Sequence, residues 1–599
     1  MKRFLPLIIA VCACLLPLFF PSCANTTQAP SGGKKDTIPP YIIDIKPLPG
    51  VVGVPLKGAT FAFTFNEYVT IKTPQNIFLS PPLRRQPKSR LRGKTLLVSF
   101  EDSLQANTTY TLSFTDAIAD ANENNPFPGY TYVFSTGEQI DSMMMTGTVV
   151  DCNTLAPIKG ATVLLHKDHG DSAVFLKRPY AATKTDDWGF FVLPYIQDTL
   201  YRLYAIKDAN NDNIYDAESE QVAFIDSLLR PVMVAGDTVR EMLKYDMLDT
   251  VRCLARRSEH ELKVFREKPS KQYIVNKVRT SERSAYLTFH APGAWIDSLW
   301  IRGWRDDQLI SQFNILQDSL ELWINSRRAA PDTMRIYVNY RMTDSTGRLV
   351  PTQEIVKLPM TRENRTYSKS SRRDLKREDT TCVYTFKAEP ENVEQDGFVL
   401  EFRNPIITEH FDSVEFKVIN TRQRETRAEF TVEQDSLNLR RYILRPKGKL
   451  QSGFEYSMKL PYRAFRDING FWSDSTVVKV SLPTDETLSV LNLELSGVDR
   501  KIIVDLLGEK RDRVLRTYVT DRDGTLRFPY LKAGRYSIRI TEDGNRNNIV
   551  DTGSLLERRQ PETVVFVELS GSQYIDIPAS TELAQPVDVG TLFNKPQQP

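Results

Sequence analysis

Two loops rich in Asp and Asn hold the residues of this chain that are best suited to chemistry. In the first loop, side-chain oxygens stand at alternate positions and once more further on, in Asp208, Asn210, Asp212 and Asp216. Oxygens spaced in this way lie on one side of a tight turn, where they can bind a hard cation such as Ca²⁺. The second loop repeats the pattern with less charge, in Asp543, Asn545, Asn547 and Asp551. Because ligand charge sets calcium affinity, the sequence predicts the stronger calcium site in the first loop.

The same loops have a simpler interpretation as turns. An EF-hand needs Gly at its sixth position and Glu at its twelfth, where the first loop has Asn213 and Ser219. Glu218 or Glu220 could complete a cation shell instead. Asp and Asn side chains also bond their own backbone in turns that bind nothing. Calcium is therefore a candidate cofactor. The alternative is an Asx-rich turn, which the two departures from the EF-hand pattern favour.

Catalytic constellations are otherwise scarce. The chain has five histidines, and the closest two, His166 and His169, lack the Glu and the helical context of a zinc protease motif. Neither a Gly-x-Ser-x-Gly elbow nor a glycine-rich phosphate loop is present. Paired carboxylates on distant strands, as in sandwich glycosidases, cannot be recognised in one sequence. The missing motifs predict that the protein is not an enzyme.

Asp-Ser or Asp-Thr pairs followed by an apolar residue recur along the chain. This pattern resembles the O-glycosylation sequon of exported Bacteroidetes proteins. The candidate acceptors are Ser103, Ser227, Thr238, Ser298, Ser319 and Ser436. The alternative is that Asp-Ser opens a turn before a strand. Both can hold, since a glycosylated residue must be exposed, and we expect at least one occupied site.

The N-terminus has the layout of a secretory signal. Lys2 and Arg3 precede an apolar run from Phe4 to Phe20, which is shorter than the roughly 20 residues that span a bilayer. Phe20-Pro21-Ser22-Cys23 resembles a lipobox in its looser Bacteroidetes form. The resemblance implies that Cys23 becomes the first mature residue and carries the acyl chains of a stable membrane anchor. We therefore expect a lipoprotein anchored in the outer membrane, on its surface or periplasmic face.

The overall composition is that of ordinary globular protein. A net charge of +3 over 599 residues gives no reason to expect nucleic acid as a partner. After removal of the signal and lipidation of Cys23, three thiols remain, in Cys152, Cys253 and Cys382. Three thiols cannot build a disulfide framework. Buried free thiols are expected, with a Cys253–Cys382 pair as the alternative.

Hydrophobic periodicity is overwhelmingly two, as in the segments around Phe61, Leu96, Tyr110 and Ile336. Such alternation, interrupted by turn residues at sandwich spacing, predicts an all-β chain of tandem β-sandwich modules. Residues 241–256 are the one segment with the pattern of a short helix. Residues 361–379 are rich in Ser, Arg and Lys, which favours a solvated linker over a site for acidic glycans.

An internal repeat organises the chain. Three blocks beginning at Thr185, Leu193 and Asp208 recur, in the same register, beginning at Thr520, Phe528 and Asp543. A weaker pair surrounds them, in which residues 104–112 correspond to 450–458 and residues 117–122 to 464–469. The chain is therefore predicted to be a unit of two modules used twice, with different material between the copies.

The repeated modules resemble known families. Residues 37–40, 104–114 and 132–137 resemble the SbsA-type bacterial Ig-like domain, and residues 147–163 look like a carboxypeptidase-regulatory-like module, which is a prealbumin-like sandwich. Together with the N-terminus, the chain is similar to Ig-like-domain lipoproteins of Bacteroidetes. The second module's family name implies no peptidase, because fold does not carry function. The predicted order is a signal peptide (1–22), a lipid-anchored linker (23–37), an Ig-like domain (38–137), a carboxypeptidase-regulatory-like sandwich (143–237), a β-sandwich of unknown type (256–360), a basic linker (361–379), a second Ig-like domain (382–484), a second carboxypeptidase-regulatory-like sandwich (488–580) and a flexible tail (581–599).

Two classes of function follow. The favoured class is a non-catalytic scaffold, bound to the membrane through its lipid and acting as an accessory subunit of an outer-membrane β-barrel complex or beside other envelope lipoproteins. The rival is glycan binding or processing, because four of the six tryptophans lie between residues 295 and 323, in Trp295, Trp300, Trp304 and Trp323. Sugar platforms use exposed Trp, whereas sandwich cores bury it, and the core interpretation is favoured.

Overall fold

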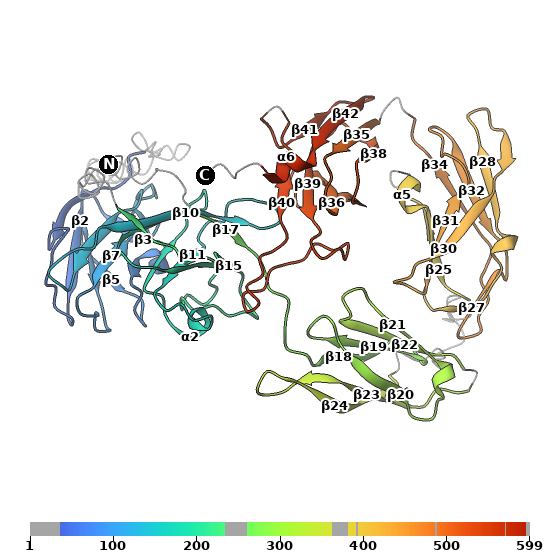
Figure 1. The fold of residues 1–599 in the computed structure, drawn as a ribbon, viewed down its shortest axis with the longest axis horizontal. Coiled ribbons are helices and arrows are strands. Elements are labelled where there is room, and N and C mark those ends of the chain that lie inside the picture. The colour runs from blue at the N-terminus through green and yellow to red at the C-terminus, as the bar shows by residue number, and fades with distance from the viewer. Residues whose placement is uncertain are drawn as a thin grey trace, which may run out of the picture. The chain divides into compact units, whose positions relative to one another are not determined.

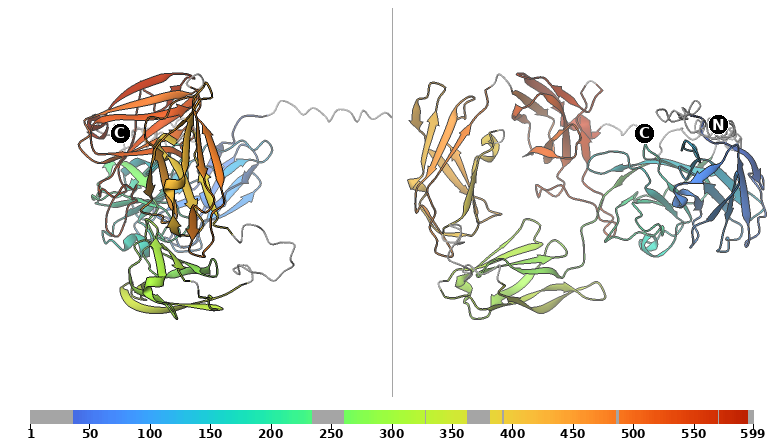
Figure 2. Two further views of the ribbon diagram at one scale, coloured as in Figure 1. Left: turned by 90° about the vertical axis from the view of Figure 1, so that its right-hand side faces the viewer. Right: turned by 180° about the vertical axis from the view of Figure 1, so that it is seen from behind.

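The structure is a computed structural model that describes residues 36–233, 260–326, 328–361, 381–390, 393–484, 488–569 and 571–594. The predicted fold class is confirmed: strands dominate, and the α-helices within these described ranges are the short α2 (Ala173–Leu176), α5 (Val393–Asp396) and α6 (Val589–Asn594) (Figures 1 and 2). No helix among these residues is long and apolar enough to cross a membrane. Predictions for the signal, Cys23, Thr238, Cys253, the helix at 241–256 and residues 362–379 lie outside the described residues.

The first sandwich has two main sheets. One has the order β1-β2-β6-β5, and the other β4-β7-β9. The bounds are β1 Ile42–Lys46, β2 Thr60–Phe65, β4 Phe78–Ser80, β5 Lys88–Arg92, β6 Thr95–Ser99, β7 Thr109–Ser113 and β9 Thr131–Ser135. A ribbon of β3 (Val69–Ile71) and β8 (Ile118–Asp120) completes it. Phe61, Phe63 and Phe65 alternate into the core, where Phe63 meets the edges of Phe114 and Tyr132. The period of two in the sequence thus reflects one buried face of β2.

The second sandwich is completed by a strand that the sequence analysis placed elsewhere. One sheet contains β10 (Met143–Asp151), β13 (Phe190–Ile196) and β16 (Val232–Met233). The other has the order β12-β11-β14-β15, with bounds Ala181–Lys184, Thr162–His166, Arg202–Ile206 and Val222–Phe224. Strand β17 (His260–Val264) pairs in parallel with residues 147–151 of β10. Although β17 lies in the range predicted for the third sandwich, it belongs to the second.

The third sandwich pairs a sheet of order β18-β19-β22-β21 with a sheet of order β20-β23-β24. Their bounds are Ile274–Arg279, Ser284–Phe289, Ser319–Ile324 and Leu309–Phe313 in the first, and Ile296–Ile301, Thr333–Thr343 and Leu349–Pro359 in the second. The core contains Leu287, Leu322, Ile336 and Val338. Leu322, Ile336 and Val338 stand on alternating inward positions, as the sequence pattern requires.

The fourth sandwich repeats the plan of the first. Its sheets have the orders β25-β26-β31-β30 and β29-β28-β32-β34, and the ribbon of β27 and β33 corresponds to that of β3 and β8. The bounds are β25 Tyr384–Lys387, β26 Phe398–Phe402, β27 Ile406–Glu409, β28 Glu415–Ile419, β29 Glu425–Arg427, β30 Phe430–Gln434, β31 Arg441–Pro446, β32 Glu455–Leu460, β33 Phe465–Asp467 and β34 Thr476–Ser481. The Tyr110 hydroxyl accepts a hydrogen bond from the Gln105 amide at 2.8 Å, and Tyr456 accepts one from Gln451 at 2.7 Å. The weaker sequence repeat is thus matched in geometry.

The fifth sandwich repeats the plan of the second. It combines a sheet of order β38-β35-β42 with one of order β37-β36-β39-β40, to which β41 adds on β39. The bounds are β35 Ser489–Ser496, β36 Ile502–Gly508, β37 Val514–Thr520, β38 Gly524–Leu531, β39 Gly534–Glu542, β40 Val564–Phe566, β41 Ile575–Ile577 and β42 Glu582–Asp588. Strand β42 pairs in parallel with β35, as β17 does with β10. The flexible tail predicted from 581 is therefore corrected, since residues 582–594 form this strand and α6, with Val587 and Val589 buried in the core.

Among the described residues, the chain groups into two compact units. Residues 36–144, 193–198 and 231–233 form one unit, and residues 145–192, 199–230 and those from 260 onward form the other.

Candidate functional site

The first Asp/Asn loop is closed by its own backbone. The Asp208 carboxylate accepts hydrogen bonds from the Asn211 amide at 2.6 Å and the Asn213 amide at 3.0 Å. The Asn210 side-chain oxygen accepts from the Asp212 amide, whose own carboxylate accepts from Ile214. These are the bonds of an Asx turn. Burial raises the pKa of Asp208, because desolvation penalises its charged form.

Glu220 is one of the two residues that the sequence analysis offered to complete a cation shell. It bridges the start of this loop and its end. Its carboxylate accepts hydrogen bonds from the amides of Ala209 at 2.9 Å and Asp216 at 3.1 Å. Burial raises the pKa of Glu220. The other candidate, Glu218, points elsewhere and pairs with Lys271.

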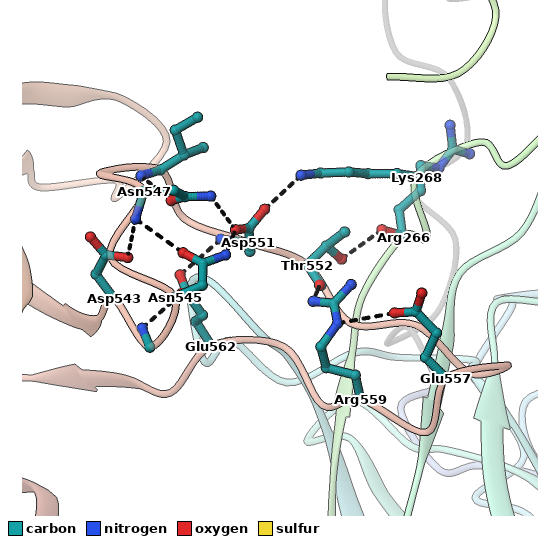
Figure 3. A network of polar contacts seen from close by, with 12 residues as sticks. Arg266, Lys268, Asp543, Asn545, Asn547, Asp551, Thr552, Glu557, Arg559 and Glu562 are labelled. Carbon is teal, nitrogen blue, oxygen red and sulfur yellow. Dashed lines mark hydrogen bonds and ion pairs between the residues drawn. The ribbon is translucent and has the colours of Figure 1, made fainter. Parts of the chain in front are cut away.

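The second loop has the same frame. Asp543 accepts from the backbone amide of Asn547 (Figure 3) and from that of Asn548. Glu562 accepts from the backbone amides of Gly544 at 3.0 Å and Asp551 at 2.8 Å. Glu562 therefore takes the place of Glu220. The sequence repeat did not reveal this glutamate, because the chain between it and Asp551 is longer in the second copy.

The positively charged side chain of Lys268 contacts the second loop. The Lys268 ammonium lies 2.6 Å from the Asp551 carboxylate, which also accepts from the Asn545 and Asn547 amides (Figure 3). Burial opposes ionisation of Asp551, but these hydrogen bonds outweigh it and lower the pKa of the carboxyl. Amide groups that donate to Asp551 present N–H toward it, whereas a metal ion would need their oxygens.

The calcium prediction therefore stays a prediction. Within the described ranges, no group of three or more His, Cys, Asp and Glu side chains is arranged to hold a metal ion. In the first loop the Asn210 side-chain amide donates to Asp212, Asp208 accepts from the Asn211 backbone amide, and Asp216 accepts from the Ser219 hydroxyl. Binding Ca²⁺ with side-chain and backbone oxygens would require carboxylates to exchange amide donors for the ion.

Backbone geometry confirms that the repeat is structural. Left-handed backbone is uncommon outside glycine, yet it recurs at matched positions of the two copies. Tyr195 and Tyr530 both have φ of 57°, Asn211 and Arg546 have 59° and 61°, and Asn213 and Asn548 have 60° and 65°.

The repeated tyrosine has a packing role that the sequence did not reveal. Tyr195 packs on Val133 and Ile140. Tyr530 is 8% exposed and belongs to the core cluster of the fourth sandwich. In both copies a tyrosine in left-handed backbone, at the end of a Leu-Pro-Tyr or Phe-Pro-Tyr sequence, packs on residues of the preceding sandwich. The motif is a junction between modules.

The predicted glycosylation acceptors divide into two groups. Ser103, Ser227 and Ser436 are exposed outside strands, where an attached glycan would find room. Ser298 lies in β20, and its hydroxyl bonds to Asn339. Ser319 lies half-buried in β22 and bonds to Asp318. The first three therefore remain the better candidates.

The tryptophans of the third sandwich are mostly packed against protein. Trp323 is 3% exposed, and the Arg440 guanidinium lies over its ring. Trp304 packs against the core, and Trp300 stacks on Tyr337 with ring centroids 5.1 Å apart. Trp295 alone of the four is mostly exposed, at 66%. These positions give no shared flat platform of exposed rings for a sugar.

The described cysteines, His166 and the pocket beside Leu450 do not have the properties of a reactive or ligand-binding site. Cys152 and Cys382 are buried free thiols, and burial raises the pKa of each to about 12. A thiol with so high a pKa supplies little thiolate, the reactive form. His166 is buried, which lowers its pKa to about 4 and keeps it neutral. A pocket of about 160 Å³ beside Leu450 is smaller than the roughly 300 Å³ at which ligand pockets begin.

Comparison with known proteins bears on the first sandwich. A family model described as bacterial Ig-like domain matches residues 36–136. Residues 36–136, which form the first sandwich, are thus similar to a bacterial Ig-like domain. This agrees with the predicted resemblance for this segment, and the fourth sandwich repeats the strand order of the first.

Among solved structures, the TIE protein of Bacillus anthracis is similar at 8% identity and a TM-score of 0.14, covering 93% of this chain and 76% of that one. The S-layer protein rSbsC has 10% identity and a TM-score of 0.16, covering 74% and 66%. BcpA, the major pilin subunit of Bacillus cereus, has 11% identity and a TM-score of 0.13, covering 75% and 99%. Scores this low carry no functional argument. No curated protein matches the chain.

Proposed function

We propose that the protein is an outer-membrane lipoprotein, anchored through Cys23, that acts as a non-catalytic scaffold. Its natural partner is an outer-membrane β-barrel protein or another envelope lipoprotein, in a complex for secretion, uptake or barrel assembly. The observation that carries the proposal is a pair of β-sandwiches that is built twice, each time with a tyrosine packed at the junction between its two members. A chain that multiplies binding modules gains affinity by linking weak contacts.

The chemistry of the described side chains supports a scaffold over an enzyme. The Asp and Glu groups of both loops bond to backbone amides, the described histidines and cysteines form no metal cluster, and the two thiols are buried. Catalysis requires a base, an acid or a nucleophile held near a space for substrate. The arrangement instead offers exposed strands and loops, such as β24 and β37, which stand at sheet edges.

The test is affinity purification of the lipidated protein from gently solubilised envelopes. We expect a β-barrel protein or lipoprotein to co-purify in stoichiometric amount. A chain ending after Lys268 should keep its anchor and first two sandwiches, because β17 completes the second, but should lose the partner. Recovery of the full-length protein as a lone monomer after crosslinking would contradict the scaffold.

The glycan-binding rival is tested separately. Trp295 is the most exposed tryptophan of the third sandwich, so Trp295→Ala should abolish binding to a glycan array if the rival is right. Trp304→Phe, which changes a packed ring, is the matched control. We expect no glycan retention by the unmodified chain.

A further inference from the structure

The fifth sandwich carries an insertion that its earlier copy lacks. Glu220 follows Asp216 by four residues, whereas the equivalent Glu562 follows Asp551 by eleven. The extra residues therefore lie in the segment 552–560, which we call the arm. Two backbone hydrogen bonds of 2.8 Å between Ser554 and Arg559 close the arm into a hairpin. Because the rest of the loop matches the first copy, the arm is an addition to a frame that is complete without it.

The base of the arm contacts the segment that follows β17. The Thr552 hydroxyl donates to the Arg266 carbonyl at 2.6 Å (Figure 3). The Leu555 amide donates to the Glu267 carboxylate at 2.7 Å. Leu555 is 2% exposed. Lys268, in the same segment after β17, forms an ion pair with Asp551 at the base of the arm.

A glycine lets the arm approach closely. A Cβ added to Gly553 would lie 2.6 Å from the Phe265 ring and 2.8 Å from the Arg559 carbonyl. Real Cβ atoms do not approach so near, so this position needs glycine for the packing of the ring. Phe265 itself bridges to Val222 and so belongs to the second sandwich.

The tip of the arm contacts the second sandwich directly. The Arg558 guanidinium lies 3.5 Å from the Asp171 carboxylate and 3.1 Å from that of Asp226, and 5.4 Å from the centre of the Phe224 ring. Gln560 donates to the Phe224 carbonyl at 3.0 Å. Phe224 lies on β15, the edge of its sheet, so the arm satisfies a carbonyl on an open edge.

Charge on the two sides is complementary. Arg558 of the arm meets Asp171 and Asp226, while Asp551 at its base meets Lys268. Both sides belong to one compact unit of the same chain. Opposite charges on two facing surfaces favour their association, whereas like charges facing one another disfavour it.

We propose that residues 552–560 are a docking arm by which the fifth sandwich binds the second sandwich of the same chain. The surface it occupies consists of Asp171, Phe224, Asp226 and the segment 265–268. The later copy of the module thus binds the earlier copy. The arm is present in the fifth sandwich and absent from the second, so it sets the direction of the interaction.

The test reverses one charge in the full chain purified without its lipid. Arg558→Glu places a carboxylate beside Asp171 and Asp226, and should raise hydrogen exchange at residues 222–228 and 265–268 roughly tenfold. It should also increase the radius of gyration measured by small-angle X-ray scattering. Arg546→Glu makes the same charge change in the same loop, outside the arm, and should alter neither. Combining Arg558→Glu with Asp226→Arg should restore protection.

Lys268→Met is a second variant that leaves the arm intact and should raise exchange at 265–268 alone. Unchanged exchange and scattering in both variants would overturn the proposal. It would equally be overturned if sedimentation showed that protection at 222–228 depends on a dimer, since the arm would then bind a second copy.

Discussion

Replacing Tyr530 with Ala should loosen the junction between the fourth and fifth sandwiches. The ring is 8% exposed and packs in the core cluster of the fourth sandwich. Truncating a buried aromatic side chain to Ala costs about 3 to 5 kcal/mol, because both transfer free energy and a cavity are involved. We expect Tyr530→Ala to lower the unfolding free energy of the fourth sandwich by that amount.

The left-handed backbone of Tyr530 supplies an internal check. With φ of 57°, an alanine there keeps the backbone strain, whereas glycine relieves it. Tyr530→Gly should therefore be less destabilising than Tyr530→Ala by about 1 kcal/mol, the reverse of the usual order in strands.

The assay is pulse proteolysis of the full chain across a urea series. Cleavage within residues 393–484 reports the lost packing of the ring, and cleavage within residues 488–569 reports the backbone strain, because Tyr530 lies in β38 of the fifth sandwich. Following each module by itself avoids treating a multidomain chain as two-state. Tyr462→Ala is the control, since that ring is 62% exposed and its loss should cost less than about 1 kcal/mol. If Tyr530→Ala is as mild as Tyr462→Ala, the junction is not held by the tyrosine.

Three further predictions concern the anchor and the loops. Cys23→Ala should move the protein from the membrane fraction to the soluble one, and retention in the outer membrane would refute lipid anchoring. Millimolar calcium should raise the melting temperature of the second sandwich by mass action, and Asp208→Ala with Asp212→Ala should abolish the rise; an unmoved melting curve would leave the first loop as a turn only. Because burial raises the folded-state pKa of Asp208, the wild type should gain stability relative to Asp208→Asn as pH falls through that pKa. The pKa of Asp551 is lowered instead, so its contribution is present above the unfolded pKa and is lost as pH falls through the folded one. Melting curves of Asp208→Asn and Asp551→Asn between pH 3 and 7 should therefore diverge from wild type in opposite directions.

Local patterns made much of the fold predictable. The alternation around Phe61 and Ile336 identified strands because one face of each is buried, and the matched blocks identified both copies of the repeat. The closing strands were missed for a physical reason. β17 and β42 owe their place to pairing with strands far back in the sequence, and the segment of β42 contains Pro586, which weakens its strand pattern.

The candidate site was predictable in part. The alternating oxygens of Asp208 and Asp543 correctly marked tight turns, because that chemistry is local. Glu562 escaped notice because the arm separates it from Asp551. The role of Tyr195 and Tyr530 was hidden because a left-handed φ redirects a side chain that a strand pattern would place by alternation.

The parallel closing strands also determine how these modules would bear tension. In the second sandwich, residues 147–151 lie beside 260–264 with both strands running the same way. Force applied to the two chain ends would enter at opposite ends of this pair, so its hydrogen bonds would be loaded together in shear instead of opening one at a time. The fifth sandwich has the same arrangement in residues 490–496 and 582–588. In a chain tethered at one end and held by a partner at the other, the pulling force would therefore load these strand pairs in shear, the direction in which they resist separation best.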